Sequence, residues 1–477
     1  CIRDSWVVGI VLGVYIGTIV LLNIPNIQQA MSVFVAEELS EVLNTKVVIG
    51  RINMGLLNRI IIDDVLLDDQ SGQEMLKVTR LSAKFDIMPF FKGKISISSV
   101  QLFGFNIDLR KETPDSPPNF KFVLDAFASK DTVKKENSLD LRINSILIRR
   151  GRMSYHVLSE EETPGKFNAK HIQLQNIIAN ISLKALSKDS LNLGIKRLSL
   201  DEKASGFSLK KMSLKLVANN KQTNIDNFTI ELPETSLKLD TIHLEYDSLK
   251  AFDRFTEQVH FSFRTLPSQV TLKDISPFVP ILSHFKEPVT LDMEVKGTVD
   301  QLTCSHLEIT ADDRQFRLRG DVSLQDLSRP QDAYVYGTLS ELSANTRGVG
   351  FLVRNLSPNY NGVPPLLERL GNVSFQGEIS GYFTDLVTYG QLQTSLGNVK
   401  TDLKLSSDKT KGLFAYSGAV KTEDFQLGKL LDNEELGEIT FNLDVHGRHI
   451  ADHLPAVELK GLIASIDYSR YRYENIT

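Results

Sequence analysis

The order of apolar and polar residues divides the chain into a short helical beginning and a long remainder with strand periodicity. Residues 6–24 carry no charged side chain, and a helix of this length spans about 28 Å, close to the thickness of a bilayer's hydrocarbon core. The pattern predicts a transmembrane helix over 6–24 after a short flank, 1–5. Its anchoring residues are Trp6, Val7, Val8, Ile10, Val11, Leu12, Val14, Ile16, Ile19, Val20, Leu21 and Leu22.

A cleaved signal peptide is the competing interpretation of this segment. Signal peptides have apolar runs of about 7–15 residues that end at small residues. Here the run is longer, and Asn23-Ile24-Pro25-Asn26 is a poor cleavage site. An uncleaved anchor is favoured over a signal peptide and over a buried core helix. Arg3 is offset by Asp4, so charge alone does not set the orientation.

Residues 25–45 show helical spacing of apolar side chains. The polar side chains Gln28, Gln29, Glu37, Glu38 and Glu41 gather on the opposite face. We expect the apolar face to cover the first strands, because a helix on a membrane surface would carry Lys and Arg instead. The apolar residues are Ile27, Ala30, Met31, Phe34, Val35, Leu39, Val42 and Leu43.

From Lys46 onward the period changes to two, which is typical of strands with one apolar and one polar face. Within 94–109 the phase changes near Ser98-Ser99 and at Phe103-Gly104, as bulges or a turn would require. Few helical patterns intervene. The sequence predicts a mainly β fold: an elongated, repetitive antiparallel sheet curled into a groove, with a few short helices. The same alternation recurs in 141–155, 208–217, 236–244, 259–263, 289–295, 316–324, 373–379, 413–420, 439–445 and 457–466.

A glycine flanked by apolar residues recurs about every 40 residues in the second half, which suggests an internal repeat of two hairpins. The recurring positions are Gly297, Gly337, Gly377, Gly418 and Gly461.

A sheet with one apolar face must keep that face from water. It packs on a second sheet as a sandwich, or it curls into a trough that holds acyl chains, which gain about 0.8 kcal/mol per buried CH₂. The alternation leaves both possibilities open. Candidate groove residues are Ile95, Ile97, Val100, Leu102, Phe105, Ile107, Leu109, Leu291, Met293 and Val295.

Net charge and candidate catalytic or metal-binding residues point to no additional function. The net charge is -5, from 54 Lys+Arg and 59 Asp+Glu, so no basic field points to nucleic acid. His446, His449 and His453 are interpreted as a loop rather than a metal site. The acidic pairs Asp63-Asp64 and Asp68-Asp69 are interpreted as turn residues, and the run 160–162 is interpreted as a solvated loop. No phosphate loop or nucleophile motif occurs. We expect no enzyme activity, cofactor or metal.

Three stretches resemble, in their order, the N-terminal region of the AsmA/TamB superfamily: 34–52, 60–87 and 92–109. Residues 120–127 followed by LRINSILIRRGRMSYH (141–156) look like the Bacteroidota branch of TamB-like proteins. The resemblance covers about the first 160 residues and defines two regions. An AsmA/TamB-like region spans 46–160, and a repetitive β-groove spans 161–477 and is expected to continue beyond this fragment.

The resemblance implies a single-pass inner-membrane protein with its bulk in the periplasm. It implies phospholipid in the groove and a TamA-like outer-membrane barrel as partner, in phospholipid transport, protein assembly in the outer membrane, or both. Two alternatives remain open. One is a membrane-anchored β-rich scaffold or adhesin with a core filled by side chains. The other is a membrane-tethered enzyme, for which the sequence offers no polar site.

Overall fold

The computed structural model describes residues 13–477 except 15, 56–57, 87–94, 128–138, 141–143, 187–189, 312–313, 330–331, 357–361, 409–412 and 451–455. Strands account for 61% of the chain and form an open, antiparallel arrangement with few helices. The expectation of a mainly β, repetitive antiparallel fold is confirmed. The chain forms two compact units. The first is Cys1–Leu216, Ile230–Pro233 and Ile275–Pro280, and the second is Val217–Thr229, Glu234–Asp274 and Ile281–Thr477.

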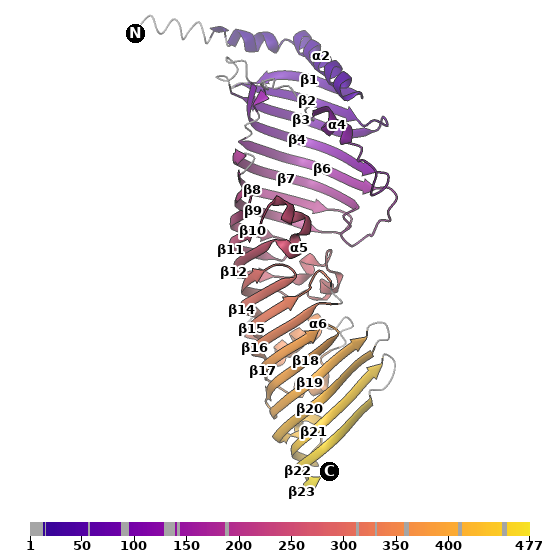
Figure 1. Ribbon diagram of the computed structural model, residues 1–477, viewed down its shortest axis with the longest axis vertical. Helices are drawn as coiled ribbons and strands as arrows, with labels where there is room; N and C mark the ends of the chain where they lie inside the picture. The colour runs from indigo at the N-terminus through magenta and orange to yellow at the C-terminus, as the bar shows by residue number, and fades with distance from the viewer. Residues whose placement is uncertain are drawn as a thin grey trace, which may run out of the picture. The chain divides into compact units, whose positions relative to one another are not determined.

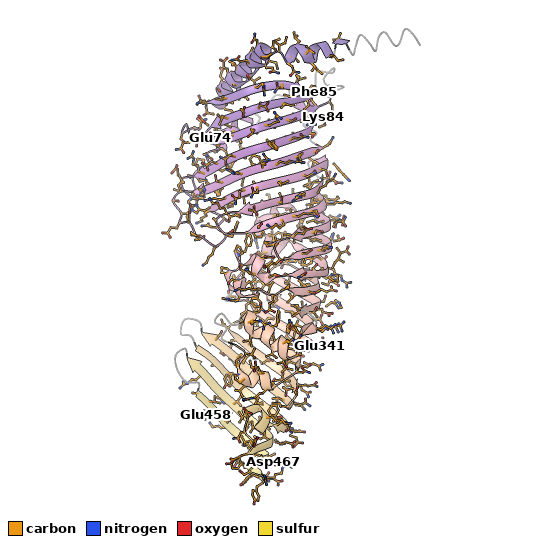
Figure 2. All side chains as sticks on the ribbon, turned by 180° about the vertical axis from the view of Figure 1, so that it is seen from behind. Glu74, Lys84, Phe85, Glu341, Glu458 and Asp467 are labelled. Atoms are coloured by element: carbon orange, nitrogen blue, oxygen red, sulfur yellow. The ribbon has the colours of Figure 1, made fainter. Side chains whose placement is uncertain are left out.

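In the first unit, strands hydrogen-bond mostly in chain order and lie side by side (Figure 1). The exception is β4, which pairs in parallel with β6. The chain between them holds helix α4 and the two-residue strand β5. The subdivision expected at residue 160 falls between β6 and β7 and stays a prediction. The strands are β1 (Val47–Gly55), β2 (Arg59–Asp68), β3 (Glu74–Phe85), β4 (Ile95–Lys111), β5 (Leu139–Asp140), β6 (Ser145–Val157), β7 (His171–Leu186) and β8 (Ser190–Glu202). Figure 2 shows Glu74 and Phe85 at opposite ends of β3.

Strands β9 (Ser208–Asn219) and β10 (Gln222–Glu231) include residues of both units. Within the second unit, each strand from β11 to β23 pairs antiparallel with the next. They are β11 (Ser236–Glu245), β12 (His260–Val270), β13 (Val289–Gly297), β14 (Gln301–Ala311), β15 (Phe316–Gln325), β16 (Tyr334–Ala344), β17 (Val373–Tyr382), β18 (Asp385–Thr394), β19 (Gly397–Asp408), β20 (Leu413–Gln426), β21 (Leu436–Ile450), β22 (Ala456–Tyr468) and β23 (Tyr471–Ile476).

Short helices occupy the connections between strands. They are α4 (Lys121–Phe127), η1 (Leu249–Arg254), α5 (Phe255–Gln258), η2 (Leu272–Ile275), η3 (Pro280–His284), α6 (Thr346–Leu356), α7 (Pro365–Arg369) and α8 (Leu427–Leu431). The glycine spacing near 40 residues is not a structural period. Gly297 to Gly337 runs from β13 to β16, whereas Gly337 to Gly377 runs from β16 to β17 with α6 and α7 between them.

Helix α2 (Pro25–Leu43) packs on β1 (Figure 1), and its orientation differs from the expected one. Proline at the first position and left-handed Asn44 (φ 49°) after the last residue set its ends. The buried residues include Gln28 and Ser32, while Phe34 is 62% exposed and Val42 57% exposed. The expected faces were therefore partly wrong. Gln28 is tolerated inside because its amide Nε2 donates to the side-chain oxygens of Asn23 and Asn53.

Candidate functional site

The register of the first unit places apolar side chains in rows that run across neighbouring strands. Residues that are directly opposite in a ladder lie on the same side of a sheet, so each row belongs to one apolar face. Two of these rows are Val47–Leu67–Leu76–Ile107–Met153–Leu174 and Ile52–Ile62–Leu81–Leu102–Ile148–Ala179.

A line of unusual backbone conformations separates these two rows. Asp64 (φ 56°) lies opposite Gly50, Gly104 (φ 65°) lies opposite Thr79, and Arg150 (φ 56°) lies beside Gly104. A left-handed residue interrupts the alternation of side chains between the two faces of a strand. In β4, Leu102 and Phe105 are three positions apart and therefore serve the same face.

The sequence predicts two changes in the phase of the apolar–polar alternation within residues 94–109. Each corresponds to a structural feature of β4. The register of β3 and β4 shifts between Lys84 and Phe85, opposite the Ser98-Ser99 region, and Gly104 lies at positive φ. The groove candidates Val100, Leu102, Phe105 and Ile107 are opposite apolar residues of β3. Phe105 is 7% exposed, while Ile97, Val100, Leu102, Ile107 and Leu109 are partly exposed. Ile95 lies in β4, but its side chain is outside the described residues.

The second unit repeats the arrangement over more strands. One row runs from Phe263 in β12 through Val295, Cys304, Val322, Gly337, Ile379, Thr388, Leu403, Gly418 and Val445 to Leu459 in β22. A second row runs from Leu291 through Ile309, Leu318, Leu342, Phe375, Leu392 and Val399. The groove candidates Leu291, Met293 and Val295 alternate along β13, so they share this apolar face.

Register shifts also line up in the second unit. They fall between Arg264 and Ser268, between Asp292 and Glu294, between Cys304 and Leu307, and between Leu339 and Leu342. Bulges bend strands and increase their twist, so the strands from β12 to β17 are expected to bend near this line. From β17 to β20 the strands pair without a shift.

Helices cover one margin of the apolar face in each unit. In the first unit, α2 and α4 pack against Val47, Ile49 and Ile52. In the second, Val349 and Phe351 of α6 pack on the row that includes Ile309 and Leu318. Among the described residues the strands pair in open ladders, mostly with their neighbours in the chain. Beyond the helices, side chains such as Val322, Ile379 and Leu403 stay partly exposed.

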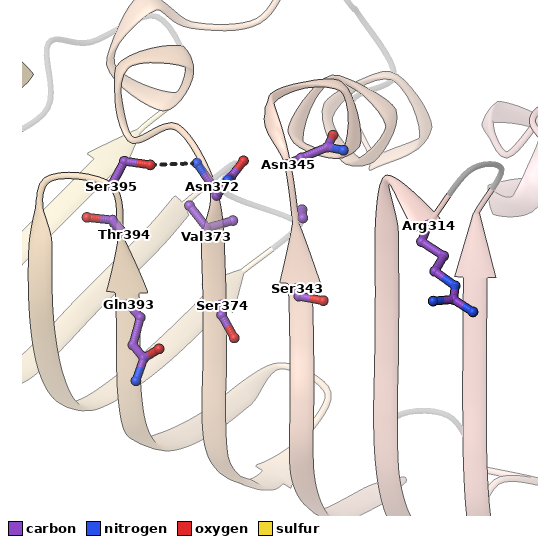
Figure 3. A pocket seen from close by; sticks show the side chains of 10 residues that line it. Arg314, Ser343, Asn345, Asn372, Val373, Ser374, Gln393, Thr394 and Ser395 are labelled. Carbon is purple, nitrogen blue, oxygen red and sulfur yellow. Dashed lines mark hydrogen bonds between the residues drawn. The ribbon is translucent and has the colours of Figure 1, made fainter.

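The opposite face is polar and held by cross-strand ion pairs. Glu308 accepts hydrogen bonds from Arg317 (2.7 Å) and Arg319 (3.1 Å), and these contacts lower the pKa of the Glu308 carboxyl. A pocket on the second unit is lined by Ser343, Ser374 and Gln393, together with the apolar Ala344 and Val373, at the ends of β16 to β18 (Figure 3). Nearby, the backbone N–H of Asn372 donates to Ser395 Oγ (3.0 Å). Apolar ligands therefore have one chemically suited face.

The expected anchor is described only from Gly13. Trp6, Val7, Val8, Ile10, Val11 and Leu12 lie outside the described residues. Val14, Ile16, Val20 and Leu21 are 51–64% exposed, whereas Ile19 and Leu22 are less so. In the described part of the chain, no single helix is long and apolar enough to cross a membrane. The helix Ile16–Leu22 and α2 are long and apolar enough for a membrane span only when they are taken together, and the two helices are bent by 71° relative to each other.

The histidine segment interpreted as a loop is partly a strand. His446 and His449 belong to β21, which continues to Ile450, and His453 is outside the described residues. The loop interpretation was wrong because it could not include the pairing of β21 with β20. Sequence reasoning also missed His156 and His171, which the antiparallel pairing of β6 and β7 makes direct neighbours.

Comparison with protein-family models, with curated proteins and with solved structures found no match.

Proposed function

We propose that this chain is an AsmA/TamB-like bridge protein, anchored in the inner membrane of a diderm bacterium and extending into the periplasm. Its apolar face carries phospholipid toward the outer membrane and supports outer-membrane protein assembly. The observation that carries the proposal is the set of apolar rows that cross many strands while remaining partly exposed. Apolar surface of this extent, left open by the described part of the protein, calls for an apolar ligand.

The chemistry of the face fits acyl chains. The rows offer aliphatic side chains and glycines without charged groups, so an acyl chain is desolvated without stranding a buried charge. Each methylene that leaves water contributes about 0.8 kcal/mol. Because successive rows are similar, a lipid has many near-equivalent positions and no single deep site. A TamA-like barrel as partner rests on the resemblance alone.

The exposed apolar side chains near the N-terminus support membrane attachment. Val14, Ile16, Val20 and Leu21 present apolar surface to their surroundings, which is costly in water. On α2, Val33 and Phe34 extend this surface. In the proposal, these residues contact the membrane from which lipid reaches the first strands.

The test is site-specific photocrosslinking in cells, followed by lipid analysis of the crosslinked chain. A photoreactive residue replaces Ile107 or Met293 on the apolar face. The matched controls replace the sequence neighbours Asn106 and Glu294 on the polar face. Phospholipid adducts at Ile107 and Met293 but not at the controls are the expected result. Equal labelling of both faces, or no lipid adducts with a folded chain, would refute the lipid groove.

A charge on the apolar face gives a second test, and its position matters. Phe105 and Val295 are only 7% and 3% exposed, so a carboxylate there would be buried and would unfold the local strands. Ile107 is partly exposed and therefore better suited. Ile107→Asp is expected to reduce copurified phospholipid several-fold, whereas Asn106→Asp is not. Unchanged lipid in Ile107→Asp would contradict the proposal.

A further inference from the structure

A histidine pair closes one end of the β6–β7 hairpin in the first unit. His156 lies near the end of β6, and His171 begins β7 directly opposite. Their Nδ1 atoms are 3.1 Å apart. His171 is only 6% exposed, and the His156 side chain is 21% exposed. Two ring nitrogens therefore converge on one point in a site largely shielded from water.

The backbone sets the tautomer of His171. Its Nε2 lies 2.9 Å from the carbonyl oxygen of Glu160, which only accepts hydrogen bonds. Nε2 must therefore carry the proton, and in the neutral ring Nδ1 presents a lone pair toward His156. A histidine that ligates a metal commonly donates its other N–H to a carbonyl in this way.

A carboxylate stands beside the pair. Glu162 Oε1 is 4.0 Å from His156 Nδ1, and the ligand atoms of His156, Glu162 and His171 all lie within 4.8 Å of one another. The Glu162 side chain is 62% exposed and free to turn. The nearby Glu160 carboxylate is instead engaged with Lys170 Nζ (2.6 Å).

We propose that His156, His171 and Glu162 bind a divalent transition metal of the zinc type. Two nitrogens bound to tetrahedral zinc at roughly 2.0–2.1 Å are about 3.3 Å apart, close to the separation observed here. The Glu162 carboxylate must move closer to the two nitrogens to complete a two-histidine, one-carboxylate set. A fourth position stays open to water. Imidazole ligands favour zinc, copper and nickel over calcium and magnesium.

Metal binding also changes the tautomer that His156 adopts at this site. Without a metal, one Nδ1 must carry a proton for the two rings to attract each other, and this proton must belong to His156. With a metal, His156 binds through its Nδ1 lone pair and carries its proton on Nε2, a tautomer change that solvent exchange allows. The Glu162 side chain is largely exposed, so its charge stays in contact with water beside the ion.

A metal bound at this site would cross-link the loop between β6 and β7. That loop is already shaped by backbone bonds from Val157 N to Lys170 O (2.9 Å) and from Leu158 N to Lys111 O (2.9 Å). A metal joining His156, Glu162 and His171 ties both ends of the loop to its middle. The expected consequence is local rigidity rather than catalysis.

The test is metal titration of the full-length chain after chelator treatment. One Zn²⁺ per chain is expected to bind, and Co²⁺ is expected to give the strong visible absorption of a four-coordinate site. Zn²⁺ should slow hydrogen exchange in residues 158–170. His156→Gln is expected to weaken Zn²⁺ binding by at least about tenfold, and Glu162→Gln by less. Both positions are partly or largely exposed, so these variants should fold.

The matched control is His243→Gln. His243 Nε2 lies 2.9 Å from Glu245 Oε1 in an exposed pair in which no second histidine takes part. Its loss should leave Zn²⁺ binding unchanged. Fewer than one Zn²⁺ per chain, or equal binding by folded His156→Gln and the parent chain, would overturn the proposal. Neither outcome bears on lipid binding, so the two proposals fail separately.

Discussion

The contact between Phe105 and Gly151 gives a sharp test of the packing on the apolar face. Phe105 in β4 is 7% exposed, and its ring lies over Gly151 in the adjacent strand β6. A Cβ at position 151 would lie 2.5 Å from Phe105 Cε1 and 3.1 Å from Ile177 Cβ. Real atoms do not approach this closely, so the ring must leave its position when Gly151 becomes alanine.

The expected energies form a double-mutant cycle. Gly151→Ala should destabilise the first unit by about 1–3 kcal/mol through overpacking. Phe105→Ala should cost about 3 kcal/mol, the lower end for a buried phenylalanine. With the ring already removed, adding Gly151→Ala should be neutral or gain about 0.5 kcal/mol, because glycine is unfavourable inside a strand. The interaction energy then has a magnitude of about 1–3.5 kcal/mol.

Urea-dependent hydrogen exchange of peptides from β4, β6 and β7 measures this locally. The control is Gly337→Ala in β16, where a Cβ would meet Val322 Cγ2 at 3.4 Å, an ordinary contact. That change should be nearly neutral. If Gly151→Ala destabilises the Phe105→Ala variant as much as it does the parent chain, the ring does not lie over Gly151 and the reasoning is refuted.

Three further outcomes are expected. Burial alone would raise the pKa of Asp69, but hydrogen bonds from Ser71, Gln73, Arg110 and Asn119 outweigh it and lower the pKa to about 2. This carboxylate therefore stabilises the fold above pH 3.8 by up to about 2 kcal/mol and loses that effect as pH falls toward 2, so acid unfolding of Asp69→Asn should depend less on pH. Burial and the charge of Asp321 raise the pKa of the Cys304 thiol, so the folded chain should resist alkylation there at pH 8 until urea is added, as peptide mass spectrometry would show. Gln28→Ala should cost about 1–2 kcal/mol in urea unfolding because it removes the donor to Asn53 Oδ1, while exposed Gln29→Ala should cost little; equal effects would contradict the orientation of α2.

Local sequence determined where the strands are. Alternation of apolar and polar residues marked β4, β13, β15 and β20, because a half-buried strand needs one face of each kind. It also marked the phase changes in β4, since a bulge and a left-handed glycine each leave a local break in the alternation. Leu291, Met293 and Val295 could be assigned to one face on the same ground.

Only the tertiary structure decided how those strands match. Asp64, Arg150 and the register that aligns them with Gly104 are far apart in sequence, so no local pattern shows that they form one line. The same holds for His156 and His171, which become neighbours through the pairing of β6 with β7.

Which face of α2 is buried also depended on residues outside the helix. Gln28 is buried because Asn23 and Asn53 satisfy its amide, and Phe34 remains outside although it is apolar. Hydrophobicity along one segment sets the kind of element, because that depends on local periodicity. Register, bending and polar pairing depend on residues elsewhere in the chain, and these features decide which side chains converge into a site.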